Sequence, residues 1–391
     1  MLAFTFPGQG SQKPNMGAAW TDHPSWELVL DASDVIGRDV AKLLLDADAE
    51  ELRAPRNTQL ATFIMSMVVL DAVERVGLAP SLAAGHSLGE YTALTATGAL
   101  SFEDGARIVS ERGEAMQFAA DERPGSMTAL LGISDDDADA ACRRADGDVW
   151  IANYNAPGQI VIAGEVGALE RASAAAKELG AKRAVPLPVG GAFHTPYMAP
   201  ARDRLREVIA SASLQAPEVP VIANIDARPH DNPADWASLL TAQLVSPVRW
   251  RQSVLAMVDA GITTLLELGP GGVLTGLAKR IVPDCRAVSI AAPDDIDRLL
   301  ELLNGAAPVP RRVAEGEHLS LTVRMVVSPA AGIYQPVSAA SNGAGVAVGG
   351  LMGHIGEVEV RSPFGGIISG MLALSGERVT SGQPIAWLDV S

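Results

Sequence analysis

The chain has 391 residues, of which 48% are hydrophobic and 19% charged, so it can bury the cores of two or three domains. Its formal net charge of −16 argues against a protein that binds DNA, RNA or an anionic membrane, because each of these partners needs a basic surface.

Cysteine content and the N-terminal residues indicate the compartment. Cys142 and Cys285 offer neither a disulfide framework nor the ligand spacing of a metal site, which is typical of a reducing cytoplasm. Residues 1–12 lack the basic start of a signal peptide. Apolar runs elsewhere fall short of the ~20 residues that a membrane helix needs. We therefore expect a cytoplasmic protein without a membrane segment.

The first predicted elements alternate between strands and helices. Residues 2–6 form an apolar run that ends at Pro7, which indicates a buried strand entering a tight loop. Residues 58–76 carry apolar side chains at helical spacing and predict a largely buried helix. Residues 81–85 predict a strand that passes through a sharp turn into another helix. This order predicts an α/β domain with a parallel sheet.

A different pattern occupies residues 123–187. Strand-like segments at 127–133 and 159–165 alternate with helix-like segments at 135–145 and 167–180, which predicts a small inserted α+β subdomain. The main domain then resumes with three further strand candidates, at residues 220–227, 262–270 and 285–290.

The C-terminal part has its own organisation. Residues 304–320 are rich in Pro, Gly, Ala and charge and predict a linker. The remainder, 321–391, contains an internal repeat of short, glycine-punctuated strands and predicts a small two-fold β domain. The repeat matches Val327-Ser328-Pro329 and Gly332-Ile333 with Arg361-Ser362-Pro363 and Gly366-Ile367, and Val346 and Gly349 with Val379 and Gly382.

The segment Gly85-His86-Ser87-Leu88-Gly89 matches the G-x-S-x-G pattern of a nucleophilic serine. The two glycines permit a strained strand-to-helix turn that exposes the serine hydroxyl at the end of a strand. A glycine-rich turn with a capping serine is the structural alternative. The apolar strand before the motif and the helical pattern after it favour the nucleophile.

A serine nucleophile needs a base, and the chain contains six histidines. His194 lies in the loop of residues 190–196, just before a predicted helix. The alternative to a catalytic role is an ordinary histidine on a surface loop. His86 is adjacent to Ser87 on the turn, so we expect its side chain to point elsewhere and to have a structural role. His194 is therefore the candidate base.

Several short motifs, in this order over roughly residues 1–300, resemble those of the malonyl-CoA:acyl-carrier-protein transacylase family. They are Phe6–Gln12 at the N-terminus, Gly85–Tyr91 around the serine, Arg112 within Glu111–Gln117, the asparagine-rich segment Asn153–Gln159, Gly191–His194, and Gln243 ahead of Ser246–Trp250. The resemblance implies an α/β-hydrolase-like core made of residues 1–122 and 188–303. It also implies a ferredoxin-like α+β subdomain at 123–187.

The same resemblance implies the catalytic roles. Ser87 attacks a thioester carbonyl, and His194 takes its proton and later returns it to the leaving thiol. The backbone amides of Gln9 and Leu88 form the oxyanion hole. The backbone carbonyl of Gln243 steadies the histidine, which suits a chain in which no third carboxylate of a triad stands out.

Two further residues are implied to select the substrate. Arg112 binds the carboxylate of malonyl through two parallel hydrogen bonds and, left unpaired, disfavours acetyl. From composition alone, a surface ion pair with Glu111 or Glu114 would be the preferred interpretation of this arginine. Phe193 precedes the histidine, and in related polyketide acyltransferases a phenylalanine there goes with malonyl rather than methylmalonyl.

The implied reaction moves malonyl from coenzyme A to Ser87 and then to the phosphopantetheine thiol of an acyl carrier protein. Exchange between thioester and ester is nearly isoenergetic, so we expect no metal and no other cofactor. The acidic carrier needs a basic landing surface. Candidates are Lys182, Arg183, Arg249, Arg251, Lys279 and Arg280.

Three other functions remain open from the sequence. A hydrolase that edits acyl carriers would use the same serine and histidine but would gain nothing from a carboxylate-binding Arg112. The malonyl transferase of a malonate decarboxylase fits the same motifs. A non-catalytic scaffold that binds carrier proteins predicts loss of Ser87 or His194, and both are present.

The C-terminal repeat resembles a biotinyl/lipoyl carrier domain, in which a lysine on a hairpin between the halves is modified. Alignment back from Ser362 and Gly366 puts Ile355 near that position, and no lysine follows Lys279. The resemblance therefore implies a carrier fold that holds neither biotin nor lipoate. A docking, dimerising or stabilising role and a vestigial fusion are both compatible with this.

Overall fold

The computed structural model describes residues 1–305, 323–356, 358–362, 365–380 and 382–389. The chain divides into two compact units, Met1–Ala306 and Ala307–Ser391, which are described separately below. Most of the predicted linker at 304–320 lies outside the described residues. Its first two residues instead belong to the end of helix α12 (Pro293–Gly305).

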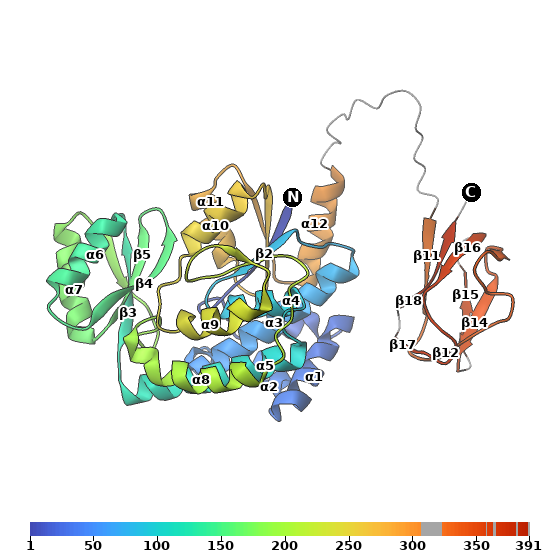
Figure 1. Ribbon diagram of the computed structural model, residues 1–391, viewed down its shortest axis with the longest axis horizontal. Helices are drawn as coiled ribbons and strands as arrows, with labels where there is room; N and C mark the ends of the chain where they lie inside the picture. Colours follow the sequence, from blue (N-terminus) through green and yellow to red (C-terminus); the bar gives the residue numbers. More distant parts are fainter. Residues whose placement is uncertain (306–322, 357, 363–364, 381, 390–391) are drawn as a thin grey trace, which may run out of the picture. The chain divides into compact units, whose positions relative to one another are not determined.

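A six-stranded sheet organises the first unit (Figure 1). Its order is β10–β9–β1–β2–β7–β8, and all pairs are parallel except β7 with β8. The strands confirm the alternation predicted for the main domain, although residues 220–227 yield only a two-residue strand before the chain turns. The bounds are β1 Leu2–Phe6, β2 Leu82–Gly85, β7 Val221–Ile222, β8 Pro229–His230, β9 Thr264–Leu268 and β10 Arg286–Ile290.

Helices cover both faces of this sheet. Alternate side chains of β1 enter different cores: Ala3 packs with α10 (Trp250–Asp259) and α11 (Val273–Ile281), while Phe4 packs with α3, α4 and α5 on the other face. Burial on both faces explains the unbroken apolar strands. The helices on the second side are α3 Pro55–Arg75 and α4 Leu88–Ala96, and α5 Phe102–Glu122 packs on α3.

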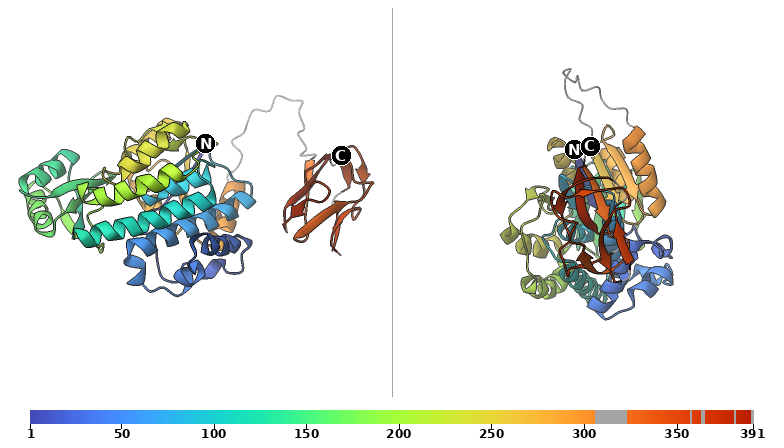
Figure 2. Two further views of the ribbon diagram at one scale, coloured as in Figure 1. Left: turned by 60° about the horizontal axis from the view of Figure 1, so that its bottom comes forward. Right: turned by 90° about the vertical axis from the view of Figure 1, so that its right-hand side faces the viewer.

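The predicted buried helix at 58–76 is confirmed as α3, which is buried nearly all round from Asn57 to Leu70. Helices α5 and α8 lie side by side in the left view of Figure 2. The remaining helices of the unit are α1 Glu27–Ile36, α2 Val40–Leu45, α8 Ala199–Ser211 and α9 Pro233–Gln243. In the described part of the chain, no helix is long and apolar enough to cross a membrane.

A smaller antiparallel sheet is inserted between α5 and α8. Its order is β4–β5–β3–β6, and α6 and α7 pack on one face around a separate apolar core (Figure 1). The predicted strands and helices of this segment are confirmed, and two strands, β4 and β6, were not expected. The bounds are β3 Ser126–Leu131, α6 Asp135–Arg144, β4 Val149–Ala156, β5 Gln159–Gly164, α7 Val166–Glu178 and β6 Arg183–Pro186.

The second unit consists of two four-stranded antiparallel sheets, β11–β18–β16–β13 and β15–β14–β12–β17. Strand β13 pairs with β16 and β17 pairs with β12, so the two halves of the repeat exchange short strands. The bounds are β11 Val323–Val327, β12 Gly332–Pro336, β13 Gly345–Val346, β14 Leu351–Ile355, β15 Val358–Arg361, β16 Gly366–Met371, β17 Arg378–Val379 and β18 Pro384–Asp389.

Repeat residues occupy matching places in this unit. Gly349 and Gly382 follow β13 and β17 with φ of 75° and 83°, a backbone region that favours glycine. Ser328 and Ser362 are both buried. Ile355 is 3% exposed and packs into the core. Ile355 itself is therefore not an exposed attachment position, and the alignment places it only near one.

Candidate active site

Ser87 lies on a strained turn between β2 and α4. Its φ of 54° and ψ of −103° are unusual for a residue with a side chain. The flanking glycines are required by sterics, because a Cβ on Gly85 would lie 1.8 Å from the Gly89 carbonyl oxygen. A Cβ on Gly89 would lie 2.0 Å from the carbonyl oxygen of Phe6. The predicted strand, sharp turn and helix are all present.

We expect Gly85→Ala to destabilise the fold by about 3 kcal/mol or more, because the added methyl group overlaps fixed backbone atoms. Thermal unfolding measures this loss. Gly276→Ala is the matched control, since an exposed Cβ within α11 meets no atom within 4 Å. That change is expected to stabilise by about 0.5–1 kcal/mol. A wild-type melting temperature for Gly85→Ala would contradict the steric argument.

His194 reaches Ser87 from the loop before α8. Its Nε2 lies 2.8 Å from Ser87 Oγ, and its Nδ1 lies 2.9 Å from the backbone carbonyl oxygen of Gln243. Since a carbonyl can only accept, Nδ1 carries the hydrogen and Nε2 presents its lone pair to the hydroxyl. Burial, and then the charge of Arg112, lower the pKa of His194 to about 3. The imidazole is therefore neutral near pH 7 and can accept a proton.

Arg112 projects from α5 into the same site and is 1% exposed. Its Nη2 donates to Ser87 Oγ and to Gln243 Oε1, both at 3.0 Å, and its Nη1 donates to Gln59 Oε1. The guanidinium lies over the Tyr91 ring at 5.2 Å from its centroid. A buried cation thus lies next to the hydroxyl of the serine.

The surface ion pair considered for Arg112 is wrong. Glu111 pairs instead with Arg204 of α8. Arg112 faces the core because it follows Ile108 and Val109 at helical spacing, on the buried stripe of α5, a helix that packs against α3 and α8.

Buried polar side chains form hydrogen bonds that fix the turn at Ser87. The Asn224 side chain accepts from the Ser87 amide and donates to the Gly85 carbonyl, both at 2.7 Å. Glu90, which is 1% exposed, accepts from the Asn224 amide at 2.7 Å and from the Gln243 side-chain amide. Gln243 Nε2 also donates to the Ser87 carbonyl at 2.8 Å. Burial raises the pKa of Glu90 to about 7.

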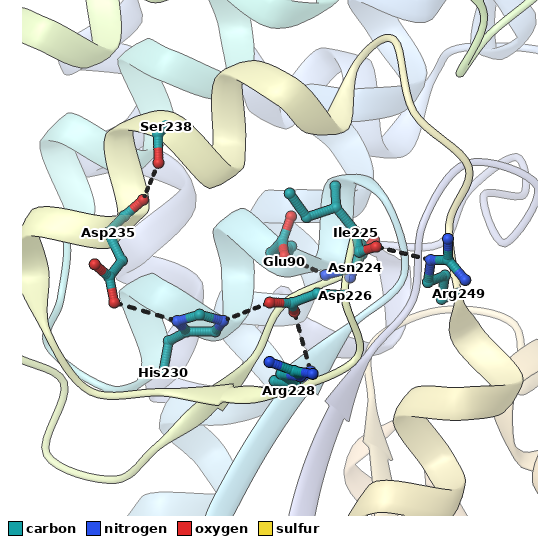
Figure 3. Close-up of polar contacts among 9 residues, drawn as sticks. All are labelled: Glu90, Asn224, Ile225, Asp226, Arg228, His230, Asp235, Ser238 and Arg249. Atoms are coloured by element: carbon teal, nitrogen blue, oxygen red, sulfur yellow. Dashed lines mark hydrogen bonds and ion pairs between the residues drawn. The ribbon is translucent and has the colours of Figure 1, made fainter.

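Figure 3 shows how the loop after β7 is braced around Asn224. Arg249 Nε donates to the Ile225 carbonyl at 2.8 Å. His230 lies between two carboxylates, with Nε2 3.0 Å from Asp226 and Nδ1 3.3 Å from Asp235 (Figure 3). These contacts fix the loop that positions Asn224 under the serine.

Two adjoining cavities lead to Ser87. The inner one, about 90 Å³, contains Ser87 and His194 in its wall, and the outer one, about 410 Å³, extends to Arg53 and the start of α11. Because they share five wall residues, the two form a continuous path from the surface to the serine. The shared residues are Gln9, His86, Asn153, Leu187 and Val189, and the inner cavity adds Met116, Met127 and Phe193.

The other predicted site residues also lie here. Gln9 lines both cavities, and Phe193 is 4% exposed in the wall of the inner one. Leu88 is the first residue of α4, directly after the serine. His86 turns away from the hydroxyl, as expected, and its Nε2 lies 2.9 Å from Asn155 Oδ1.

Sequence reasoning missed four residues of the site: Gln59, Glu90, Asn224 and Arg53. Glu90 and Asn224 could have been noticed as polar residues within otherwise apolar stretches, although nothing in the sequence joins them. The basic candidates are only partly free, since Arg251 is bound to Asp135 and Arg280 to the Gln159 side chain. Among the described residues, no group of three or more His, Cys, Asp or Glu side chains could hold a metal ion.

Comparison with known proteins connects this geometry to a family. The chain is 41% identical over 310 residues to the malonyl CoA-acyl carrier protein transacylase of Bacillus subtilis, an alignment covering 77% of this chain and 97% of the relative. It is 42% identical over 306 residues to the Escherichia coli protein of the same name, covering 77% and 99%.

Solved structures of similar proteins match this chain as well. An acyl-carrier-protein S-malonyltransferase from Burkholderia pseudomallei matches with a TM-score of 0.74 and 42% identity, covering 77% of this chain and 99% of that one. A malonyl-transacylase solved in complex with its type II polyketide acyl-carrier protein matches with a TM-score of 0.74 and 40% identity, covering 77% and 99%. The model of the acyl transferase domain family matches residues 3–293, so the chain belongs to that family.

Proposed function

We propose that the protein transfers malonyl from malonyl-CoA to the phosphopantetheine thiol of an acyl carrier protein through an acyl-serine intermediate. One observation carries the proposal: Ser87 Oγ lies within hydrogen-bond distance of both the His194 imidazole and the Arg112 guanidinium. A base and a carboxylate-binding cation thus meet at one hydroxyl. The names of the relatives support the same substrate and acceptor.

The first half-reaction forms the acyl-enzyme. Ser87 Oγ attacks the thioester carbonyl while its proton passes to Nε2 of His194. The Gln243 carbonyl, 2.9 Å from Nδ1, stabilises the imidazolium that forms. When the tetrahedral intermediate collapses, the carbon–sulfur bond breaks and His194 returns the proton to the departing thiol of coenzyme A.

Two backbone amides are proposed to stabilise the developing oxyanion. The amide of Leu88 begins α4, so the positive end of the helix dipole lies behind it. The amide of Gln9 belongs to the loop after β1, in the wall of both cavities. Removing one such donor typically costs ~3–4 kcal/mol of transition-state stabilisation.

Arg112 is proposed to select malonyl by its carboxylate. A guanidinium forms two parallel charge-assisted hydrogen bonds with a carboxylate, and acetyl offers no group to replace them. Phe193 narrows the inner cavity, which favours the unbranched malonyl group over methylmalonyl.

The outer cavity is proposed to receive the pantetheine arm. Its wall is mostly apolar and amide-bearing, and Arg53 supplies a positive charge toward which a phosphate can be drawn. In the second half-reaction, the thiol of the carrier's pantetheine follows the same path, gives its proton to His194 and takes the malonyl group from Ser87. These steps need no metal, nucleotide, biotin or lipoate.

The proposed function is tested by following the malonyl group from coenzyme A to the protein and on to a carrier. Incubation with radiolabelled malonyl-CoA is expected to give a labelled protein, and addition of a phosphopantetheinylated acyl carrier protein is expected to move the label to the carrier. Release of free malonate without a carrier would favour the thioester hydrolase, and no label at all would favour the binding scaffold.

We also propose specific fold types for the parts of the chain. The order β4–β5–β3–β6 with two helices on one face supports a ferredoxin-like subdomain on an α/β-hydrolase-like core. The exchanged strands of the second unit support a biotinyl/lipoyl-type fold. No lysine follows Lys279 in the sequence. We propose that this unit carries neither biotin nor lipoate and contributes docking, dimerisation or stability.

A further inference from the structure

We infer that Glu90 is a positioning residue that orients the side-chain amide of Gln243 and, through it, the malonyl-selecting guanidinium of Arg112. This rests on the transferase function proposed above. Glu90 touches neither the serine hydroxyl nor the cavities in the described structure, so its effect must pass through another residue.

The hydrogen bonds of Glu90 fix the orientation of the Gln243 side-chain amide. One carboxylate oxygen accepts from the Asn224 backbone amide at 2.7 Å, and the other accepts from Nε2 of Gln243. Both carboxyl oxygens of Glu90 face N–H donors, so each accepts, and Glu90 holds the –NH₂ end of the Gln243 amide toward itself. The carbonyl end must then point the other way.

The opposite end of the same amide faces Arg112. Gln243 Oε1 accepts from Arg112 Nη2 at 3.0 Å, and Nε2 also donates to the Ser87 carbonyl at 2.8 Å. If the amide rotated by half a turn, donors would face Arg112 and an acceptor would face the Ser87 carbonyl. Glu90 therefore excludes the orientation that would repel the guanidinium.

This arrangement couples three parts of the site. The backbone carbonyl of Gln243 binds His194, and its side chain binds Arg112. All three residues are at most 5% exposed, so water does not replace a lost partner. A change at Glu90 is expected to reach substrate selection as well as stability.

Glu90→Gln tests the inference with almost unchanged shape. The new –NH₂ group must face either the Asn224 amide or Nε2 of Gln243, and both are donors. We expect kcat/KM for malonyl-CoA to fall roughly ten- to a hundredfold, with a smaller loss for acetyl-CoA, so that preference for malonyl falls. The assay is initial-rate acyl transfer to the carrier with each thioester.

Glu267→Gln is the matched control. Glu267 is also 1% exposed and accepts from two backbone amides, those of Leu274 and Thr275, but contacts none of Ser87, Gln243 and Arg112. It is expected to lose stability and keep the preference for malonyl. Equal preference in wild type and Glu90→Gln would overturn the inference while leaving the transferase function intact, because the wild-type rate establishes that function separately.

Gln243→Met provides a second test if Glu90→Gln does not fold. This change removes the side-chain amide and keeps the backbone carbonyl that faces His194. We expect the same loss of malonyl preference, and the double variant is expected to lose no more than Gln243→Met alone. Additive losses, or wild-type preference in Gln243→Met, would show that Glu90 does not act through Gln243.

Discussion

Replacement of Ser87 by alanine is expected to abolish the covalent malonyl adduct and to lower transfer to the carrier protein by on the order of 10⁴-fold or more. The Ser87 hydroxyl lies 2.8 Å from Nε2 of His194, so alanine removes the nucleophile that this base activates. Brief incubation with radiolabelled malonyl-CoA, followed by a denaturing gel and intact-mass measurement, checks both effects.

Ser253→Ala is the control for this experiment. Ser253 is fully buried in α10, and its hydroxyl donates to the Arg249 carbonyl at 3.1 Å, away from both cavities. Its adduct is expected to match that of the wild type. A malonyl adduct that persists in Ser87→Ala would place the nucleophile elsewhere in the chain.

Replacement of Arg112 by alanine is expected to lower kcat/KM for malonyl-CoA by on the order of a hundredfold or more, while acetyl-CoA loses little. Preference between the two thioesters should therefore disappear. Arg112→Lys keeps the charge and loses the planar pair of donors, so we expect intermediate selectivity. Competition between malonyl-CoA and acetyl-CoA for labelling of Ser87 measures the preference directly.

Arg107→Ala controls for the loss of an arginine from the same helix. Arg107 lies on the exposed face of α5, where its Nη1 is 3.6 Å from Asp104. Surface pairs of this kind are worth about 0–1 kcal/mol, so stability and selectivity should both stay near wild type. Malonyl preference that survives in Arg112→Ala would mean that another group reads the carboxylate.

Much of the main domain could be predicted from the sequence because its strands and helices have unbroken patterns. The apolar run at 2–6 and the helical spacing at 58–76 both correspond to buried elements. The strand predicted over residues 220–227 is too long, because the apolar start is followed by a turn and only Val221–Ile222 form a strand. Strand β4 was missed because its sequence, VWIANYNA, alternates poorly and contains two asparagines that line a cavity.

The residues that react with or bind the substrate could be predicted from the sequence, whereas the buried residues that hold them in place could not. Ser87, His194 and Arg112 carry recognisable motifs, and the burial of Arg112 could have been read from its spacing after Ile108 and Val109. By contrast, Glu90 and Asn224 are separated by more than a hundred residues and meet only because β2 and β7 are neighbours in the sheet. Contacts that depend on strand order leave no local pattern in a sequence.

The backbone at Ser87 and His194 bears on how this protein could be engineered. Both residues have positive φ, 54° and 61°, where a side chain costs about 1–3 kcal/mol relative to a relaxed conformation. Glycine at either position would relieve that strain. At His194 the loss of a buried, hydrogen-bonded imidazole outweighs that relief, whereas at Ser87 it does not. A screen that rewards thermostability alone would therefore favour loss of the nucleophile, and a useful screen must reward turnover as well.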